Sequence, residues 1–113
     1  MTLPAEGTLL RIMIGESDRH EGLPLYEWIV RAAREAGLAG ATVTRGLSGY
    51  GANSVIHRAK ILELSTDLPV IIEIVDTSER IAAFVPVLDQ VVGEGLVTEE
   101  PVRIHFYRGK PSP

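Results

Sequence analysis

Apolar residues alternate with a period of two in several short stretches of the chain. Leu9–Ile14 places a leucine and two isoleucines on one face, and Val70–Val75 is β-branched at nearly every position. Ala41–Leu47 and Val102–Tyr107 show shorter versions of the same alternation. These four segments are predicted to be strands.

A helical spacing separates the first two of these segments. Apolar residues recur three and four positions apart over Leu23–Gly37, and Gly37 supplies a left-handed stop. The stripe consists of Leu25, Trp28, Ile29, Ala32, Ala33 and Ala36. The pattern therefore predicts an amphipathic helix with one buried face.

A second helix is predicted over Ser78–Val92. Its start resembles a capping box, with Asp76 or Ser78 as the cap and Glu79 reaching back. Pro86 lies in its middle, where proline costs roughly 3 kcal/mol in a straight helix. We therefore expect a kink or a split at this position.

The order of elements is strand, helix, strand, loop, strand, helix, strand. This order predicts one α+β domain over residues 1–113 with a ferredoxin-like βαββαβ fold, in which both helices cover one face of an antiparallel sheet. Residues 1–7 and 109–113 are predicted to fray. The other face would carry Leu9, Met13, Ile71 and Val75, with Arg11 and Glu73 among them. Such a patch indicates an oligomer interface, although scattered apolar surface residues would give the same pattern.

Composition and charge reduce the number of functions that the chain could have. The chain has 113 residues, a formal net charge of −4 and no cysteine. The lack of cysteine excludes disulfides and thiolate chemistry, and the negative charge argues against a nucleic-acid partner. The N-terminus lacks the order of a signal peptide and no apolar run reaches membrane-spanning length, so a cytoplasmic location is expected.

A glycine-rich stretch with basic neighbours dominates the middle of the chain. Gly46, Gly49 and Gly51 lie close together, and Arg45 and Lys60 flank them. Open backbone N–H groups beside positive charge suit an anion, whereas a hairpin loop with solvated charges explains the same residues. The spacing matches neither a phosphate-binding P-loop nor a dinucleotide fingerprint, because the lysine and the following helix that these motifs need are missing.

The sequence contains no recognisable catalytic or metal-binding motif. His20, His57 and His105 are far apart, and no nucleophile has an identifiable base, so we do not expect an enzyme. Basic residues could instead converge on a phosphate or carboxylate, within one subunit or across two. A solvated basic rim is the alternative. The residues concerned are Arg45, Arg58, Lys60, Arg103, Arg108 and Lys110.

Several segments together resemble the family catalogued as domain of unknown function 190, which is grouped with the PII-like signalling proteins. They are Leu10–His20, Gly37–Val43, Arg45–Gly46 with Gly49–Ser54, Leu68–Asp76 and Gly93–Thr98.

The resemblance implies a homotrimer that binds an adenine nucleotide at the cleft between subunits. It assigns nucleotide contacts to Arg45, Gly46, Leu47, Ser48, Gly49, Gly93, Glu94, Gly95, Arg103 and Arg108. It assigns an effector loop over residues 49–60, which contains Tyr50, Asn53, His57, Arg58 and Lys60. PII proteins have Gly-Asp-Gly-Lys in the second turn, whereas this chain has no lysine there. AMP, ADP or a cyclic nucleotide is therefore expected rather than a triphosphate, and no other cofactor is required.

Two further implications follow from the resemblance. Family members often sit beside fluoride-channel genes, which suggests a membrane transport protein such as a fluoride channel as a partner. The related CutA-like trimers, linked to metal or ion tolerance without nucleotide binding, provide the alternative function.

Overall fold

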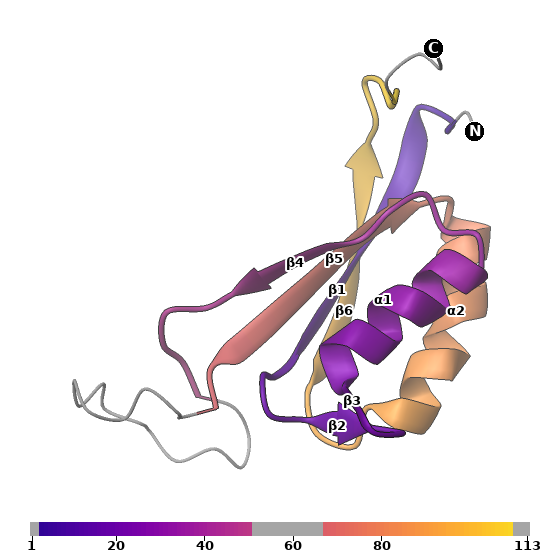
Figure 1. Ribbon diagram of the computed structural model, residues 1–113. Helices are drawn as coiled ribbons and strands as arrows, with labels where there is room; N and C mark the ends of the chain where they lie inside the picture. The colour runs from indigo at the N-terminus through magenta and orange to yellow at the C-terminus, as the bar shows by residue number, and fades with distance from the viewer. Residues whose placement is uncertain (1–2, 51–66, 110–113) are drawn as a thin grey trace.

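The computed structural model describes residues 3–50 and 67–109, which form one sheet covered by two helices (Figure 1). Its four strands are β1 (Glu6–Gly15), β4 (Thr42–Arg45), β5 (Pro69–Asp76) and β6 (Leu96–Arg103). They lie in the order β4-β5-β1-β6, and every neighbouring pair is antiparallel. This is the ferredoxin-like arrangement that the sequence predicts.

The two helices pack on the same face of the sheet (Figure 1). They are α1 (Leu25–Glu35) and α2 (Ser78–Val91), close to the predicted bounds. The buried apolar core between helices and sheet consists of Leu10, Ile12, Ile14, Leu25, Ile29, Ala33, Val70, Ile72, Ile74, Ile81, Phe84 and Leu88. The alternating burial along β1 and β5 confirms the faces assigned from the sequence.

The first strand begins earlier than predicted. Glu6 and Gly7 pair with Arg103 and Val102 of β6, so these two residues belong to the sheet rather than to a frayed end. Between β1 and α1 the polar segment forms a small hairpin of β2 (Arg19–His20) and β3 (Leu23–Pro24), where the sequence indicated only a loop.

The last strand is displaced from its predicted position. It covers Leu96–Arg103 rather than Val102–Tyr107, and it contains Glu99, Glu100 and Pro101. These residues disfavour a central strand, but among the described strands β6 is at the edge of the sheet and pairs with β1 alone. An edge strand tolerates charge and proline on its open side, which explains why alternation alone placed it wrongly.

The second helix also differs from its prediction in two details. It continues through Pro86 without a split. Pro86 and Ala82 are both exposed, so water can reach the Ala82 carbonyl that the proline leaves without an N–H partner. The N-cap is Thr77, whose side chain accepts a hydrogen bond from the Arg80 N–H (3.2 Å), and not Asp76 or Ser78.

Asp76 instead has a role inside the molecule. Its side chain is completely buried, and its two oxygens accept hydrogen bonds from the N–H of Ala39 (2.8 Å) and of Thr77 (2.7 Å). The carboxylate thus joins the α1–β4 connection to the junction between β5 and α2. A buried carboxylate is tolerated when its oxygens are hydrogen-bonded in this way.

We predict that Asp76→Ala lowers the free energy of unfolding by about 2–4 kcal/mol, because two backbone N–H groups lose their acceptor. Urea denaturation measures this loss. Asp89→Ala, at an exposed position on α2, is the control and should change stability by less than about 0.5 kcal/mol. Equal effects of the two substitutions would contradict the structural role of Asp76.

Candidate functional site

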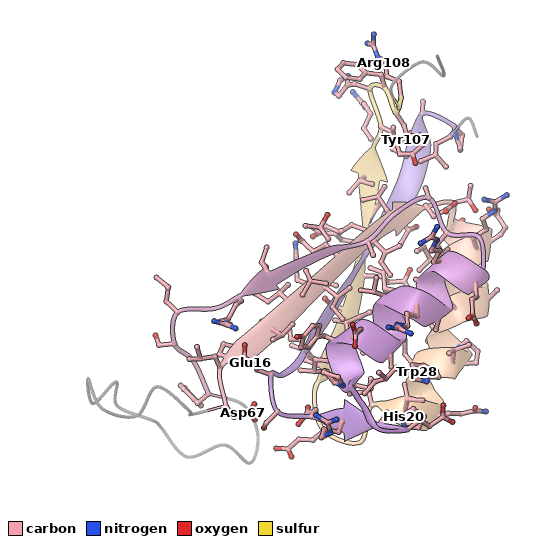
Figure 2. All side chains as sticks on the ribbon, viewed as in Figure 1. Glu16, His20, Trp28, Asp67, Tyr107 and Arg108 are labelled. Atoms are coloured by element: carbon pink, nitrogen blue, oxygen red, sulfur yellow. The ribbon has the colours of Figure 1, made fainter. Side chains whose placement is uncertain are left out.

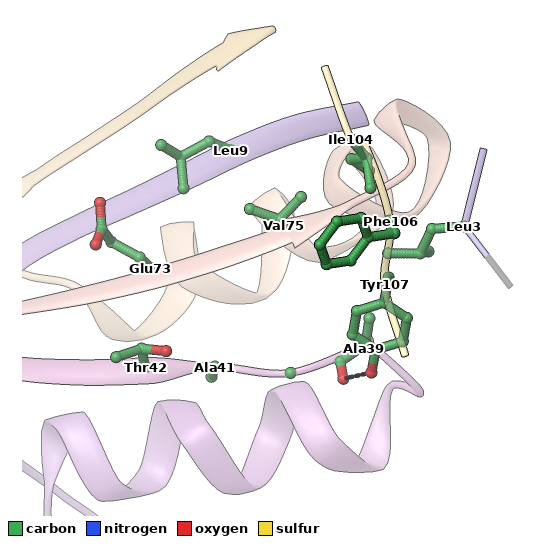
Figure 3. Close-up of a pocket in the computed structure, with 11 residues that line it drawn as sticks. Leu3, Leu9, Ala39, Ala41, Thr42, Glu73, Val75, Ile104, Phe106 and Tyr107 are labelled. Atoms are coloured by element: carbon green, nitrogen blue, oxygen red, sulfur yellow. Dashed lines mark hydrogen bonds between the residues drawn. The ribbon is translucent and has the colours of Figure 1, made fainter. Parts of the chain in front are cut away.

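A cavity of about 610 Å³ lies on the sheet face that the helices leave uncovered (Figure 3). Leu9, Glu73 and Val75 form its floor on β1 and β5. The α1–β4 connection and the segment after β6 form its walls. The lining residues are Leu3, Leu9, Ala39, Gly40, Ala41, Thr42, Glu73, Val75, Ile104, Phe106 and Tyr107.

Hydrogen bonds to the rest of the chain hold the segment after β6 in place as one wall of the cavity. The Tyr107 hydroxyl donates a hydrogen bond to the Ala39 carbonyl (2.7 Å), as Figure 3 shows, and the Ile104 N–H donates to the Ala5 carbonyl (2.6 Å). The Arg108 guanidinium lies over the Phe106 ring, 4.1 Å from its centroid. A cation is therefore in contact with an aromatic wall of the cavity.

Arg103 is the second basic residue at this end of the sheet. It is exposed and pairs with Glu6 at the last position of β6. Side chains alternate between the two faces along β1, and Leu9 and Arg11 lie on the uncovered face. Glu6 therefore lies on the face that the helices cover, and Arg103, its partner, lies on the same face. Arg108 is consequently closer to the cavity than Arg103.

The glycine-rich stretch begins at the opposite end of the sheet. The Gly46 N–H donates to the Pro69 carbonyl (2.7 Å), which joins the end of β4 to the start of β5. Arg45 makes an ion pair with Glu16 in the turn after β1. Leu47 and Tyr50 are strongly exposed, at 95% and 74%. The other predicted effector-loop residues, Asn53, His57, Arg58 and Lys60, lie outside the described residues.

The turn Gly93–Gly95 lies at this same end, but on the other edge of the sheet. Gly95 has φ +155°, and a β-carbon there would lie 2.6 Å from the Met13 carbonyl oxygen. Two strands separate β6 from β4, so the turn and Arg45 are roughly 14 Å apart across the sheet.

The structure therefore divides the predicted nucleotide-binding residues into two groups. Arg45–Gly49 and Gly93–Gly95 lie at one end of the sheet, whereas Arg103 and Arg108 lie at the other end with the cavity (Figures 1 and 2). The length of β6, roughly 25 Å, separates them. Convergence of all these residues within one subunit is excluded.

The cavity itself was not predicted from the sequence. Its walls come from Ala39–Thr42 and Ile104–Tyr107, which are distant along the chain. The aromatic pair Phe106 and Tyr107 next to Arg108 was the available signal, but the sequence placed both in a strand.

Histidine and carboxylate side chains do not form a metal site in the part of the chain that the structure describes. The His20 ring packs edge-on against Trp28, with centroids 4.8 Å apart, and the Trp28 indole N–H donates to Glu21 (3.2 Å). These contacts join the β2–β3 hairpin to α1 (Figure 2), which gives His20 a structural role. Among residues 3–50 and 67–109, neither helix is both long and apolar enough to cross a membrane.

Comparison with solved structures identifies the class of fold. The chain is similar to a structure described as CPII bound to ADP and bicarbonate, from Thiomonas intermedia K12, with a TM-score of 0.60 and 19% identity. The match covers 88% of each chain. The fold is therefore PII-like.

Sequence comparison then identifies the family. The DUF190 family, described as an uncharacterized ACR, matches residues 7–104, and the chain belongs to it. A UPF0166 protein of Aquifex aeolicus is 41% identical over 100 residues, covering 87% of this chain and 92% of the relative. A UPF0166 protein of Methanocaldococcus jannaschii is 38% identical over 103 residues, covering 90% and 93%. The resemblance seen in the sequence is confirmed.

The two outer glycines of the turn after α2 should respond differently to substitution. Gly95→Ala should destabilise the fold by more than about 1 kcal/mol, because the new methyl group meets the Met13 carbonyl and the backbone angle is strained. Gly93→Ala has open space within 4 Å and should be nearly neutral. Thermal unfolding of both variants measures the difference, and equal midpoints would contradict the close packing at Gly95.

Proposed function

We propose that the protein is a PII-like signalling protein that binds an adenine nucleotide in a cleft between subunits of a homotrimer. It acts through the effector loop at residues 49–60, and it is not an enzyme. The observation that carries the proposal is the division of the basic and glycine-rich residues between opposite ends of one chain. Two chains that meet end to end would unite them at a shared cleft.

The cavity supplies the place for the nucleotide base. Its volume is within the range of small-molecule sites, and Leu9 and Val75 on its floor and Phe106 in its wall give it apolar surfaces. The exposed Phe106 ring also offers a surface on which a base can stack. ADP is bound in the CPII structure from Thiomonas intermedia, which supports this class of ligand.

Phosphate groups would then meet cations from two subunits. Arg108, and Arg103 beyond it, would come from the chain that supplies the cavity. Arg45 and the backbone of Gly46–Gly49 would come from its neighbour, whose turn Gly93–Gly95 lies roughly 14 Å away across the sheet. Arginine is suited to this task because its planar fork donates two hydrogen bonds to one phosphate.

The uncovered sheet face supports the homotrimer. Leu96, 55% exposed, stands next to Met13, which pairs with Ile71 on its other side. Arg11 lies farther along this face and bridges Glu73 and Glu100 at 3.0 and 3.3 Å. Leu9 and Val75 belong both to this face and to the cavity, as expected for a cleft at a subunit boundary.

No observation on the described residues favours the CutA-like alternative. A cytoplasmic location and a transport protein as partner remain implications of the family resemblance.

Met13→Asp should dissociate the assembly or prevent its folding, because an unpaired buried charge costs several kcal/mol. Light scattering at micromolar concentration measures the mass. Ala83→Asp, on the exposed face of α2, introduces the same charge and should leave the assembly intact. A monomeric mass for the unmodified protein would contradict the proposed homotrimer.

Arg45→Ala and Arg108→Ala should each weaken binding of AMP or ADP about 10- to 100-fold, because each removes a charged hydrogen bond. Calorimetry measures the affinity. If the site is shared, refolding the two variants together should restore wild-type affinity at roughly a quarter of the sites, where each chain supplies its intact arginine.

Separate refolding of each variant is the control. A mixture that binds no better than the separate variants would contradict the shared site. No binding of any adenine nucleotide to the unmodified protein at millimolar concentration would contradict the proposed function.

A further inference from the structure

The corner of the sheet at the start of the glycine-rich stretch carries more negative than positive charge. Arg45 is in contact with Glu16, while Asp18 and Asp67 lie beside the same turn after β1. Glu16 contacts the guanidinium directly, while Asp18 and Asp67 accept hydrogen bonds from the backbone N–H groups of Gly15 and Ser17. Glu16 and Asp67 lie at the same corner of the sheet (Figure 2).

Backbone hydrogen bonds fix the position of Glu16. Its N–H donates to the Leu68 carbonyl (2.8 Å), and the N–H of Ser17 donates to the Asp67 carboxylate (2.7 Å). The Glu16 side chain is 32% exposed, compared with 64% for Arg45. The carboxylate is therefore less exposed to solvent than the arginine that it contacts, and its backbone is anchored.

A phosphate that approaches Arg45 must share the guanidinium with Glu16. The ion pair occupies the Nε side of the guanidinium, one of the edges through which arginine grips an anion with two donors. The negative charges of Glu16 and Asp67 also repel the ligand, and this repulsion is stronger for a ligand with more phosphate groups.

We infer that Glu16, with Asp67, is a specificity-determining residue that makes the site favour nucleotides with few phosphate groups over triphosphates. This inference rests on the proposed function, because it requires the phosphates to reach Arg45. It assigns the selection to a carboxylate in the turn after β1, on a different element from the glycine turn that follows α2.

The test compares Glu16→Gln with Glu27→Gln. Both substitutions remove one negative charge and one ion pair with an arginine, because Glu27 is paired with Arg31 on the exposed side of α1 (3.7 Å). AMP, ADP and ATP are titrated by calorimetry at fixed ionic strength without magnesium. In Glu16→Gln the preference for AMP over ATP should fall by about threefold or more, whereas Glu27→Gln should keep the wild-type ratio.

Asp67→Asn is the second variant. It removes a charge but keeps an oxygen that can accept the Ser17 N–H, and it should shift the ratio in the same direction. Thermal unfolding should change little in Glu16→Gln, since an exposed ion pair contributes at most about 1 kcal/mol.

The outcomes separate the two proposals. If AMP and ATP bind the unmodified protein, Glu16→Gln and Asp67→Asn with the same affinity ratio, Glu16 and Asp67 do not select the ligand, while the proposed function stands. If no nucleotide binds either the unmodified protein or Glu16→Gln, both proposals are wrong.

Discussion

The backbone of Ala39 is held by hydrogen bonds on two sides, and these bonds position one wall of the cavity on the uncovered face. Inside the molecule, the Asp76 carboxylate accepts a hydrogen bond from the Ala39 N–H. At the surface, the Tyr107 hydroxyl donates a hydrogen bond to the Ala39 carbonyl. One small residue thus joins α1, the start of α2 and the segment after β6. Without the buried carboxylate, the connection that walls the cavity would lose its hydrogen bond to the end of β5.

The sequence was sufficient to predict those helices and strands in which buried and exposed residues alternate regularly. β1 and β5 lie in the middle of the sheet with one face on the core, so their alternation was complete, and the stripe of α1 matched a single buried face. β6 was misplaced because an edge strand buries little and its polar residues hide the period. The cap at Thr77 was missed because the sequence could not show that Asp76 was already engaged inside the core.

The candidate site was predictable only in part. Residue types near Gly46 and Gly95 indicated an anion site, and the structure explains both glycines by close backbone or ring contacts. The cavity depends on two segments more than 60 residues apart, joined by the hydrogen bond between Tyr107 and Ala39. No local pattern records such a contact. The separation of the basic residues by the length of the sheet likewise became visible only in three dimensions.

The bond between the Gly46 N–H and the Pro69 carbonyl has a consequence for how the family can diversify. It holds the end of β4 against the start of β5, so this end of the sheet keeps its structure whatever sequence connects Gly46 to Pro69. The entropic cost of closing a loop rises by only about 0.6 kcal/mol for each doubling of its length. Relatives can therefore lengthen, shorten or rewrite the intervening sequence to suit new partners while the sheet and its core remain unchanged.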